Sequence, residues 1–203
     1  MTEQTHSEHH DYAGSKLGMW LFLFTEILLF GGLFLIYSVY RAMHPEEFHT
    51  AAKELSTTLG AINTVVLLTS SLTMAVSISA LQRGKRSISA LLQAATILLG
   101  IAFLVNKYFE WSGHIHAGLY PNAPELLSRG HGEILFTGLY YVMTGLHGIH
   151  VVIGICLIGL MLRFTLRGTL SGKRHGWLEN TGLYWHLVDV IWIYLFPLFY
   201  LIT

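Results

Sequence analysis

Five long apolar segments dominate this sequence and limit how it can fold. They cover residues 17–40, 55–82, 87–110, 134–162 and 181–203. A bilayer core of about 30 Å is crossed by roughly 20 apolar residues in a helix that rises about 1.5 Å per residue. Only 12% of the 203 residues are charged, about half the share in soluble domains. We therefore predict an all-α membrane protein with five transmembrane helices.

Basic residues are divided unequally between the two sets of loops. Eight Lys and Arg residues lie on one side of the predicted membrane, and three lie on the other. The eight are Lys16, Arg83, Lys85, Arg86, Arg163, Arg167, Lys173 and Arg174; the three are Arg41, Lys53 and Arg129. Because basic loops stay in the cytoplasm, the N-terminus is predicted to be cytoplasmic and the C-terminus periplasmic. Residues 1–16 then form a polar cytoplasmic tail, followed by a single five-helix transmembrane bundle at 17–203.

The loops differ in length. The two loops on the less basic side, 42–54 and 111–133, are long and contain Pro45, Pro121 and Pro124, which we expect to break any helix there. The basic loops are short. They predict that the second and third spans, and likewise the fourth and fifth, are antiparallel neighbours.

Ionisable residues inside the spans are the candidates for function. A charge near the bilayer centre costs about 3 kcal/mol, so each such group needs a partner or a protonated form. Glu26 lies in the apolar run LFLFTEILLFGG, and two interpretations stay open. It either binds or modulates protons, or it is a neutral acid hydrogen-bonded to a neighbouring helix.

Two more spans carry polar pairs at helical spacing. His147 and His150 lie three residues apart in the fourth span, as do His186 and Asp189 in the fifth, so each pair shares a helix face. We predict His–Asp or His–His contacts between these helices. A shared metal centre is disfavoured, because His147 lies about 24 Å from the inner face and His186 about 14 Å. Bis-histidine haem ligation is a weaker alternative.

The remaining polar groups have simpler interpretations. Lys107 and Glu110 permit an interfacial salt bridge at the end of the third span. A metal site at His6, His9 and His10 is a compositional hint only, since short polar tails are usually solvated. A lone cysteine, Cys156, allows no disulfide within the chain.

The residue pattern resembles subunit III of the haem-copper respiratory oxidases, in the short five-helix form of cytochrome c oxidase subunit III. The similar stretches are FTEILLFGGLF around Glu26, LGAINTVVLLTSS around Asn63, NKYFEW around Glu110, YYVMTGLHGIHVVIG around His147 and His150, and YWHLVDVIWIYLF around His186 and Asp189. They cover all five spans in order. The pair GLHGIHV and YWHLVDVIW is the most specific part of this resemblance.

The resemblance implies a non-catalytic subunit of an oxidoreductase complex in the bacterial inner membrane. The chain would carry no cofactor or metal of its own, with haem and copper in partner subunits. It would pack on subunit I, with subunit II and a small subunit IV as further partners, bind phospholipid and help sustain proton uptake. Glu26 matches the family's membrane-buried reactive carboxyl, which favours cytochrome c over quinol as electron donor. The other polar residues would be structural: Asn63, Glu110, His147, His150, His186 and Asp189.

Three other functions also fit this sequence. The chain would fit subunit III of a quinol oxidase or an accessory subunit of a nitric oxide reductase. A stand-alone ion or proton transporter would use Glu26, His186 and Asp189 as a relay. Transporters often contain inverted repeats, and none is visible in this sequence. Nothing in the charge pattern indicates a nucleic-acid partner.

Overall fold

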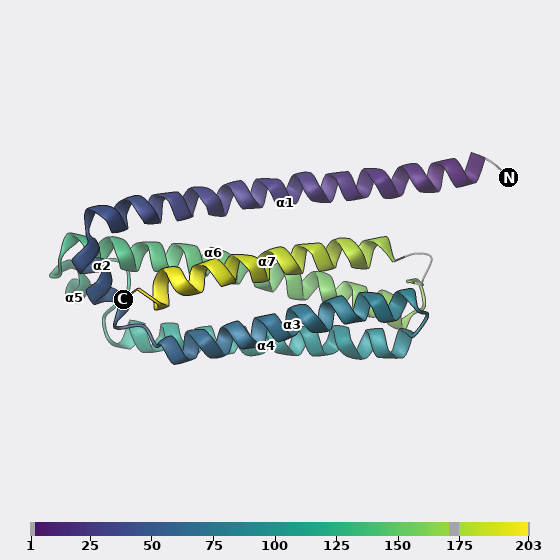
Figure 1. Cartoon of the computed structure of the whole chain (residues 1–203). Coiled ribbons are helices and arrows are strands. Elements are labelled where there is room, and N and C mark those ends of the chain that lie inside the picture. The colour runs from purple at the N-terminus through teal and green to yellow at the C-terminus, as the bar shows by residue number, and fades with distance from the viewer. Residues whose placement is uncertain (1–2, 171–174, 203) are drawn as a thin grey trace.

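The described part of the chain folds into seven α-helices. A computed structural model describes residues 3–170 and 175–202, with side chains from residue 14 onward. The helices within these residues are α1 (Glu3–Met43), α2 (Pro45–Ala52), α3 (Thr57–Gln82), α4 (Arg86–His116), α5 (Pro124–Leu127), α6 (His131–Leu166) and α7 (Gly176–Tyr200) (Figure 1). Predictions on the side chains of His6, His9, His10, Lys173 and Arg174 lie outside what is described.

Five of these helices are long and apolar enough to cross a membrane, which confirms the predicted number. They are the stretch Gly14–Met43 of α1 together with α3, α4, α6 and α7. Their outward faces carry large exposed apolar side chains such as Leu21, Leu72 and Leu98, as expected where the solvent is hydrocarbon. Several helices run beyond the predicted spans, because polar residues at a bilayer surface do not end a helix. α4, for example, continues from residue 110 to His116.

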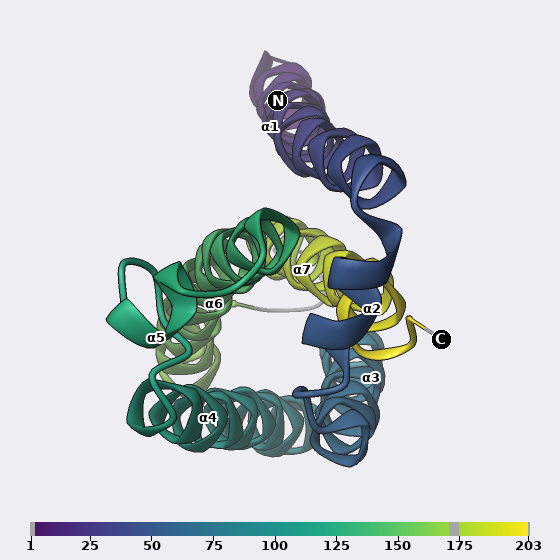
Figure 2. The same ribbon diagram turned by 90° about the vertical axis from the view of Figure 1, so that its left-hand side faces the viewer.

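Four helices form a bundle, and the first helix lies beside it. Figure 2 shows α3, α4, α6 and α7 around a common centre, with α1 outside this group. α3 packs along α4, and α6 along α7, which confirms the predicted neighbours, while α1 contacts α6 and α7. The start of α1 and the α3–α4 loop lie at one end, and α2, α5 and the C-terminus lie at the other (Figure 1). These ends match the two predicted loop sets, but which end faces the cytoplasm stays a prediction.

The proline-containing loops contain short helices, so the prediction that proline breaks any helix there was wrong. Pro45 and Pro124 are the first residues of α2 and α5, where proline lacks only a hydrogen bond that the helix would not make. Phe48 of α2 is fully buried, with its ring 5.5 Å from that of Tyr37 and 5.4 Å from that of Phe136. α2 therefore covers one end of the bundle (Figure 2).

Trp185 of α7 occupies the middle of the bundle and meets each of the other three helices. Its ring fills the space left by two glycines: a Cβ added to Gly154 of α6 would lie 2.6 Å from it, and one added to Gly100 of α4 would lie 2.9 Å from it. Its Nε1 donates to the Ser70 hydroxyl of α3 at 3.0 Å. Small residues at such contacts let helices approach closely in a membrane.

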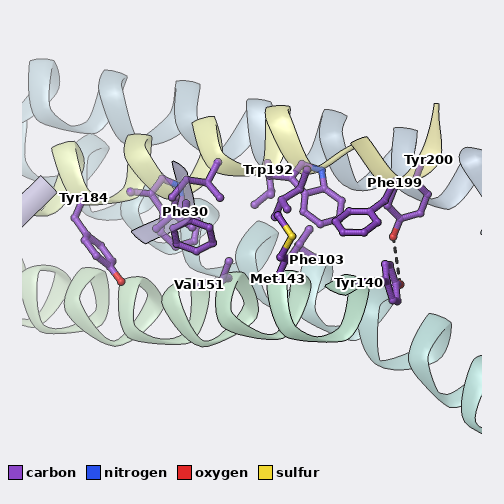
Figure 3. Close-up of a cluster of buried hydrophobic side chains, with 14 of the residues drawn as sticks. Phe30, Phe103, Tyr140, Met143, Val151, Tyr184, Trp192, Phe199 and Tyr200 are labelled. Atoms are coloured by element: carbon purple, nitrogen blue, oxygen red, sulfur yellow. Dashed lines mark hydrogen bonds between the residues drawn. The ribbon is translucent and has the colours of Figure 1, made fainter. Parts of the chain in front are cut away.

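Trp192 repeats this arrangement two turns further along α7. Its ring lies edge-on to Phe103 of α4, with centroids 4.8 Å apart, in the buried cluster drawn in Figure 3. Its Nε1 donates to Thr64 of α3 at 3.1 Å, and His147 of α6 lies 5.3 Å from its ring. The two indoles of α7 thus hold the bundle together over its central turns.

We predict that Gly154→Ala destabilises the chain by about 1–3 kcal/mol, because its Cβ overlaps the enclosed Trp185 ring. Gly159→Ala on the same helix is the matched control, since nothing lies within 4 Å of a Cβ there. Thermal denaturation of the purified chain in detergent, followed by circular dichroism, measures both. Equal midpoints for the two variants would contradict the packing described.

Candidate functional site

Glu26 of α1 is hydrogen-bonded to His150 of α6. Its Oε2 lies 2.9 Å from His150 Nε2, and the two side chains are 13% and 12% exposed. Glu26 lies nine residues from Leu17, where the predicted first span begins, which is about 14 Å into the membrane. The carboxyl that had no visible partner in its own helix therefore finds one on another helix.

Both ring nitrogens of His150 lie within hydrogen-bond distance of an oxygen. His150 Nδ1 lies 2.8 Å from the Leu146 carbonyl oxygen, which can only accept a hydrogen bond, so Nδ1 carries a hydrogen. A neutral His150 then presents a lone pair at Nε2. A hydrogen bond to Glu26 requires a proton between the two, either on the acid or on the imidazole.

Aromatic rings surround the Glu26–His150 pair. The ring of Phe30 lies edge-on to His150 at 5.4 Å, and Tyr184 stacks at 6.4 Å. The Tyr184 hydroxyl donates to the His150 carbonyl oxygen at 3.2 Å. These contacts hold the imidazole in place and keep its surroundings apolar.

Lys107 and Glu110 form the predicted ion pair, and it is buried inside the bundle. Lys107 Nζ is 3.0 Å from Glu110 Oε2, and the two residues are 7% and 5% exposed. Nζ also donates to the hydroxyls of Tyr140 and Tyr200, at 2.9 and 3.0 Å. Both hydroxyls in turn donate to Glu110 Oε1, at 2.9 and 2.6 Å. The network joins α4, α6 and α7, and Figure 3 shows the contact between the hydroxyls of Tyr140 and Tyr200 within it.

The sequence analysis did not predict a role for Tyr140 and Tyr200, although their depth in the membrane could have indicated them. Lys107 and Tyr200 each lie three residues from the end of a predicted span, and Tyr140 lies six residues after the start of another. All three therefore lie at similar depth on the same side of the membrane. A buried lysine needs several hydrogen-bond acceptors, and tyrosine hydroxyls at its depth are natural candidates.

His147 is enclosed in the bundle without a polar partner. It is 0% exposed, and neither ring nitrogen has a hydrogen bond among the described residues. Its ring packs edge-on to Phe103 at 5.5 Å and against Trp192. Asn63, also 0% exposed, accepts a hydrogen bond from Asn106 at 2.9 Å and so joins α3 to α4.

His186 and Asp189 lie between α7 and α3. His186 Nδ1 is 2.6 Å from the Ser71 hydroxyl. Asp189 is 3% exposed and lies beside the same serine, but in the described structure neither of its oxygens has a hydrogen bond of good geometry. Ser71 is a further residue that sequence analysis did not connect with this site.

The predicted contacts between the polar pairs of α6 and α7 are therefore wrong. His150 is hydrogen-bonded to α1, and His186 is hydrogen-bonded to α3. His147 packs in the apolar interior of the bundle. Residues three apart differ by about 60° around a helix, which is enough to direct them to different neighbours. Among the described residues, no group of three His, Cys, Asp or Glu side chains could hold a metal ion.

A groove of about 390 Å³ lies between α4 and α6 on the membrane-facing side. Its lining is almost wholly apolar and comes from Leu104, Lys107, Tyr108, Trp111, Thr144, Gly145, Gly148, Ile149, Val152 and Ile153. The Lys107 amine bonds to the network described above, so the groove suits an apolar chain better than a polar ligand.

We predict that Glu110→Gln costs about 3–5 kcal/mol of stability, because it leaves the Lys107 charge buried without a counter-ion. The double variant Lys107→Gln/Glu110→Gln is neutral and can still hydrogen-bond, so it recovers most of this loss. Thermal denaturation of the purified chain in detergent measures both variants. A double variant no better than the single one would contradict the ion pair.

Glu54→Gln is the control for that experiment. It breaks the Arg129–Glu54 pair, which has the same kind of charges at 2.6 Å but with side chains 32% and 36% exposed. An exposed pair of this kind contributes less than about 1 kcal/mol, so the midpoint stays close to that of the unchanged chain.

Comparison with known proteins gives a consistent result. The family model described as cytochrome c oxidase subunit III matches residues 1–203. Cytochrome c oxidase subunit 3 of Thermostichus vulcanus is 34% identical over 97% of this chain and 90% of the relative. The probable quinol oxidase subunit 3 of Staphylococcus haemolyticus is 31% identical over 99% and 95%. The haem-copper oxidase subunit I+III of Aeropyrum pernix is 29% identical over 96% of this chain and 24% of its own length.

These matches confirm the family that the sequence resembles. Relatives named for cytochrome c oxidases and for quinol oxidases both align over nearly the whole chain. The chain belongs to the cytochrome c oxidase subunit III family of the haem-copper oxidases.

Proposed function

We propose that this chain is the non-catalytic subunit III of a proton-pumping terminal oxidase that transfers electrons from cytochrome c to oxygen. It lies in a bacterial inner membrane with its N-terminus in the cytoplasm. The observation that carries the proposal is the Glu26–His150 pair, a hydrogen-bonded acid and base on two helices long enough to cross the membrane. A partly exposed, hydrogen-bonded acid and base suits a subunit that supports proton movement in a neighbouring chain.

The proposed role is to stabilise subunit I and to sustain its proton uptake. Glu26 and His150 are partly exposed, so their proton is accessible from a neighbouring chain. In the Aeropyrum pernix relative, subunits I and III are named as one protein, which supports a position beside subunit I. Subunit II and a small subunit IV are further proposed partners.

Phospholipid is the proposed ligand of the groove between α4 and α6. The groove is apolar and faces the membrane, and Trp111 and Tyr108 line it as interfacial aromatic residues do. Gly148 adds room, since a Cβ there would meet nothing within 4 Å. An acyl chain of a neighbouring lipid fits this shape and chemistry.

A quinol oxidase is the second candidate, favoured by the quinol oxidase relatives at 31% identity. A stand-alone transporter is less well supported, because its relay requires Glu26 to act with His186 and Asp189. Glu26 instead bonds to α6, and His186 bonds to α3. No contact among the described residues indicates a role in a nitric oxide reductase.

The electron donor is tested on the native complex. Purified through a tag on this chain, the complex should contain a two-copper subunit II and haem, and it should oxidise reduced cytochrome c. Oxidation of quinol alone, with no copper in subunit II, would establish the second candidate. Absence of haem and of any other oxidase chain would overturn both.

We predict that Glu26→Gln lets the complex assemble but shortens its active lifetime severalfold. The glutamine amide still donates to His150 Nε2, so α1 stays attached, but the exchangeable proton of the pair is lost. Oxygen consumption over repeated turnover measures the effect. Thr25→Ala is the control, because the hydroxyl of this exposed neighbour donates to the Phe22 carbonyl oxygen of its own helix. Equal lifetimes for the two variants would leave Glu26 a purely structural acid.

A further inference from the structure

The outer side of α7 presents one stripe of side chains to the surroundings of the bundle. His186, Val190 and Ile193 lie within about 60° of one another around the helix. Val190 and Ile193 are 45% and 43% exposed, and His186 is partly exposed. We call these three residues the α7 stripe.

The α7 stripe lies between two neighbours of α7 and is covered by neither. α1 contacts α7 on one side, where the rings of Phe34 and Tyr194 lie 6.0 Å apart. α3 contacts it on the other side, through Ser71 and His186. Figure 2 shows α1 and α3 on either side of α7.

His186 makes the stripe unusual for a lipid-facing surface. Its Nδ1 is fixed by Ser71, and its Nε2 has no hydrogen bond to any described residue. The residue lies ten positions from Gly176 at the start of α7, or about 15 Å along the helix, within the predicted fifth span. An accessible ring nitrogen is thus held at the depth where hydrocarbon offers nothing to bond with.

The surroundings of His186 add to this polarity. The Asp189 carboxyl lies 3% exposed one turn along, beside the same serine, without a hydrogen bond of good geometry in the described structure. Polar groups at this depth normally face protein or a water-filled cavity and mark a contact. The groove between α4 and α6 offers a contrast, since its lining is almost wholly apolar.

We propose that the α7 stripe is a docking surface for a transmembrane helix of another oxidase chain, which offers a hydrogen-bonding side chain to His186 Nε2. Val190 and Ile193 pack against the apolar part of the same helix. A hydroxyl, which can donate or accept, supplies the bond whichever ring nitrogen of His186 carries the hydrogen. The inference depends on the family assignment and assigns this surface to a protein partner, and not to lipid.

Photo-crosslinking in the intact complex tests the surface. Benzoylphenylalanine at Val190 should link the chain to another oxidase subunit, and peptide mapping should place the link within a transmembrane segment. The matched control is Ile149 on the outer face of α6, which is 58% exposed and should link to lipid. Links from Val190 to lipid alone, or to a second copy of this chain, would overturn the proposal.

Variants of His186 test the hydrogen bond. His186→Phe should reduce retention of the chain in detergent-washed complex by about threefold or more, as expected for one interhelical hydrogen bond in a membrane. His186→Gln, which still hydrogen-bonds, should restore retention. Membrane levels of the chain distinguish poor folding from poor docking. Equal retention of the phenylalanine variant and the unchanged chain would overturn the proposal.

The outcomes separate this inference from the proposed function. If the chain purifies with haem and other subunits but Val190 links only to lipid, the docking surface is wrong and the function stands. If the chain purifies alone, the proposed function fails, whatever Val190 contacts.

Discussion

The bundle depends on how helices are held together in a solvent that is itself apolar. Burying a leucine gains little when the lipid is equally apolar, so close packing and interhelical hydrogen bonds must supply the stability. Trp185 and Trp192 of α7 provide both. Each indole fills a space between helices and donates its single hydrogen to a hydroxyl on α3. The glycines of α4 and α6 face Trp185 because no larger residue fits there.

The same solvent decides what the ionisable residues do. Lys107, Glu110 and the two tyrosines satisfy one another completely and are enclosed, which makes their network a strong structural link among three helices. Glu26 and His150 are also bonded, but their side chains remain partly exposed. Only the latter pair combines a proton with access from outside, so it is the better candidate for a role in proton handling.

The sequence predicted the elements well and their facing surfaces poorly. Five spans and the neighbours across short loops follow from apolar length and loop length, which are properties of single segments. The partner of Glu26 does not follow, because a helix that is apolar all round gives no sign of which face meets which neighbour. His147 and His150 look equivalent in sequence, yet one is enclosed and the other reaches α1.

The position of α1 connects the fold with the proposed function. Polar contacts hold α1 at points along its length: Lys16 pairs with Glu179 at one end, Glu26 with His150 in the middle, and the Tyr37 hydroxyl donates to the Leu198 carbonyl oxygen near the other end. The middle contact is the one that depends on a proton. Without that proton, the one ring hydrogen of a neutral His150 must lie on Nε2 to bond the carboxylate, and the bond from Nδ1 to the Leu146 carbonyl oxygen is then lost. On the proposed function, the proton of this one pair therefore links the hydrogen bonding of His150 within α6 to the contact that holds α1.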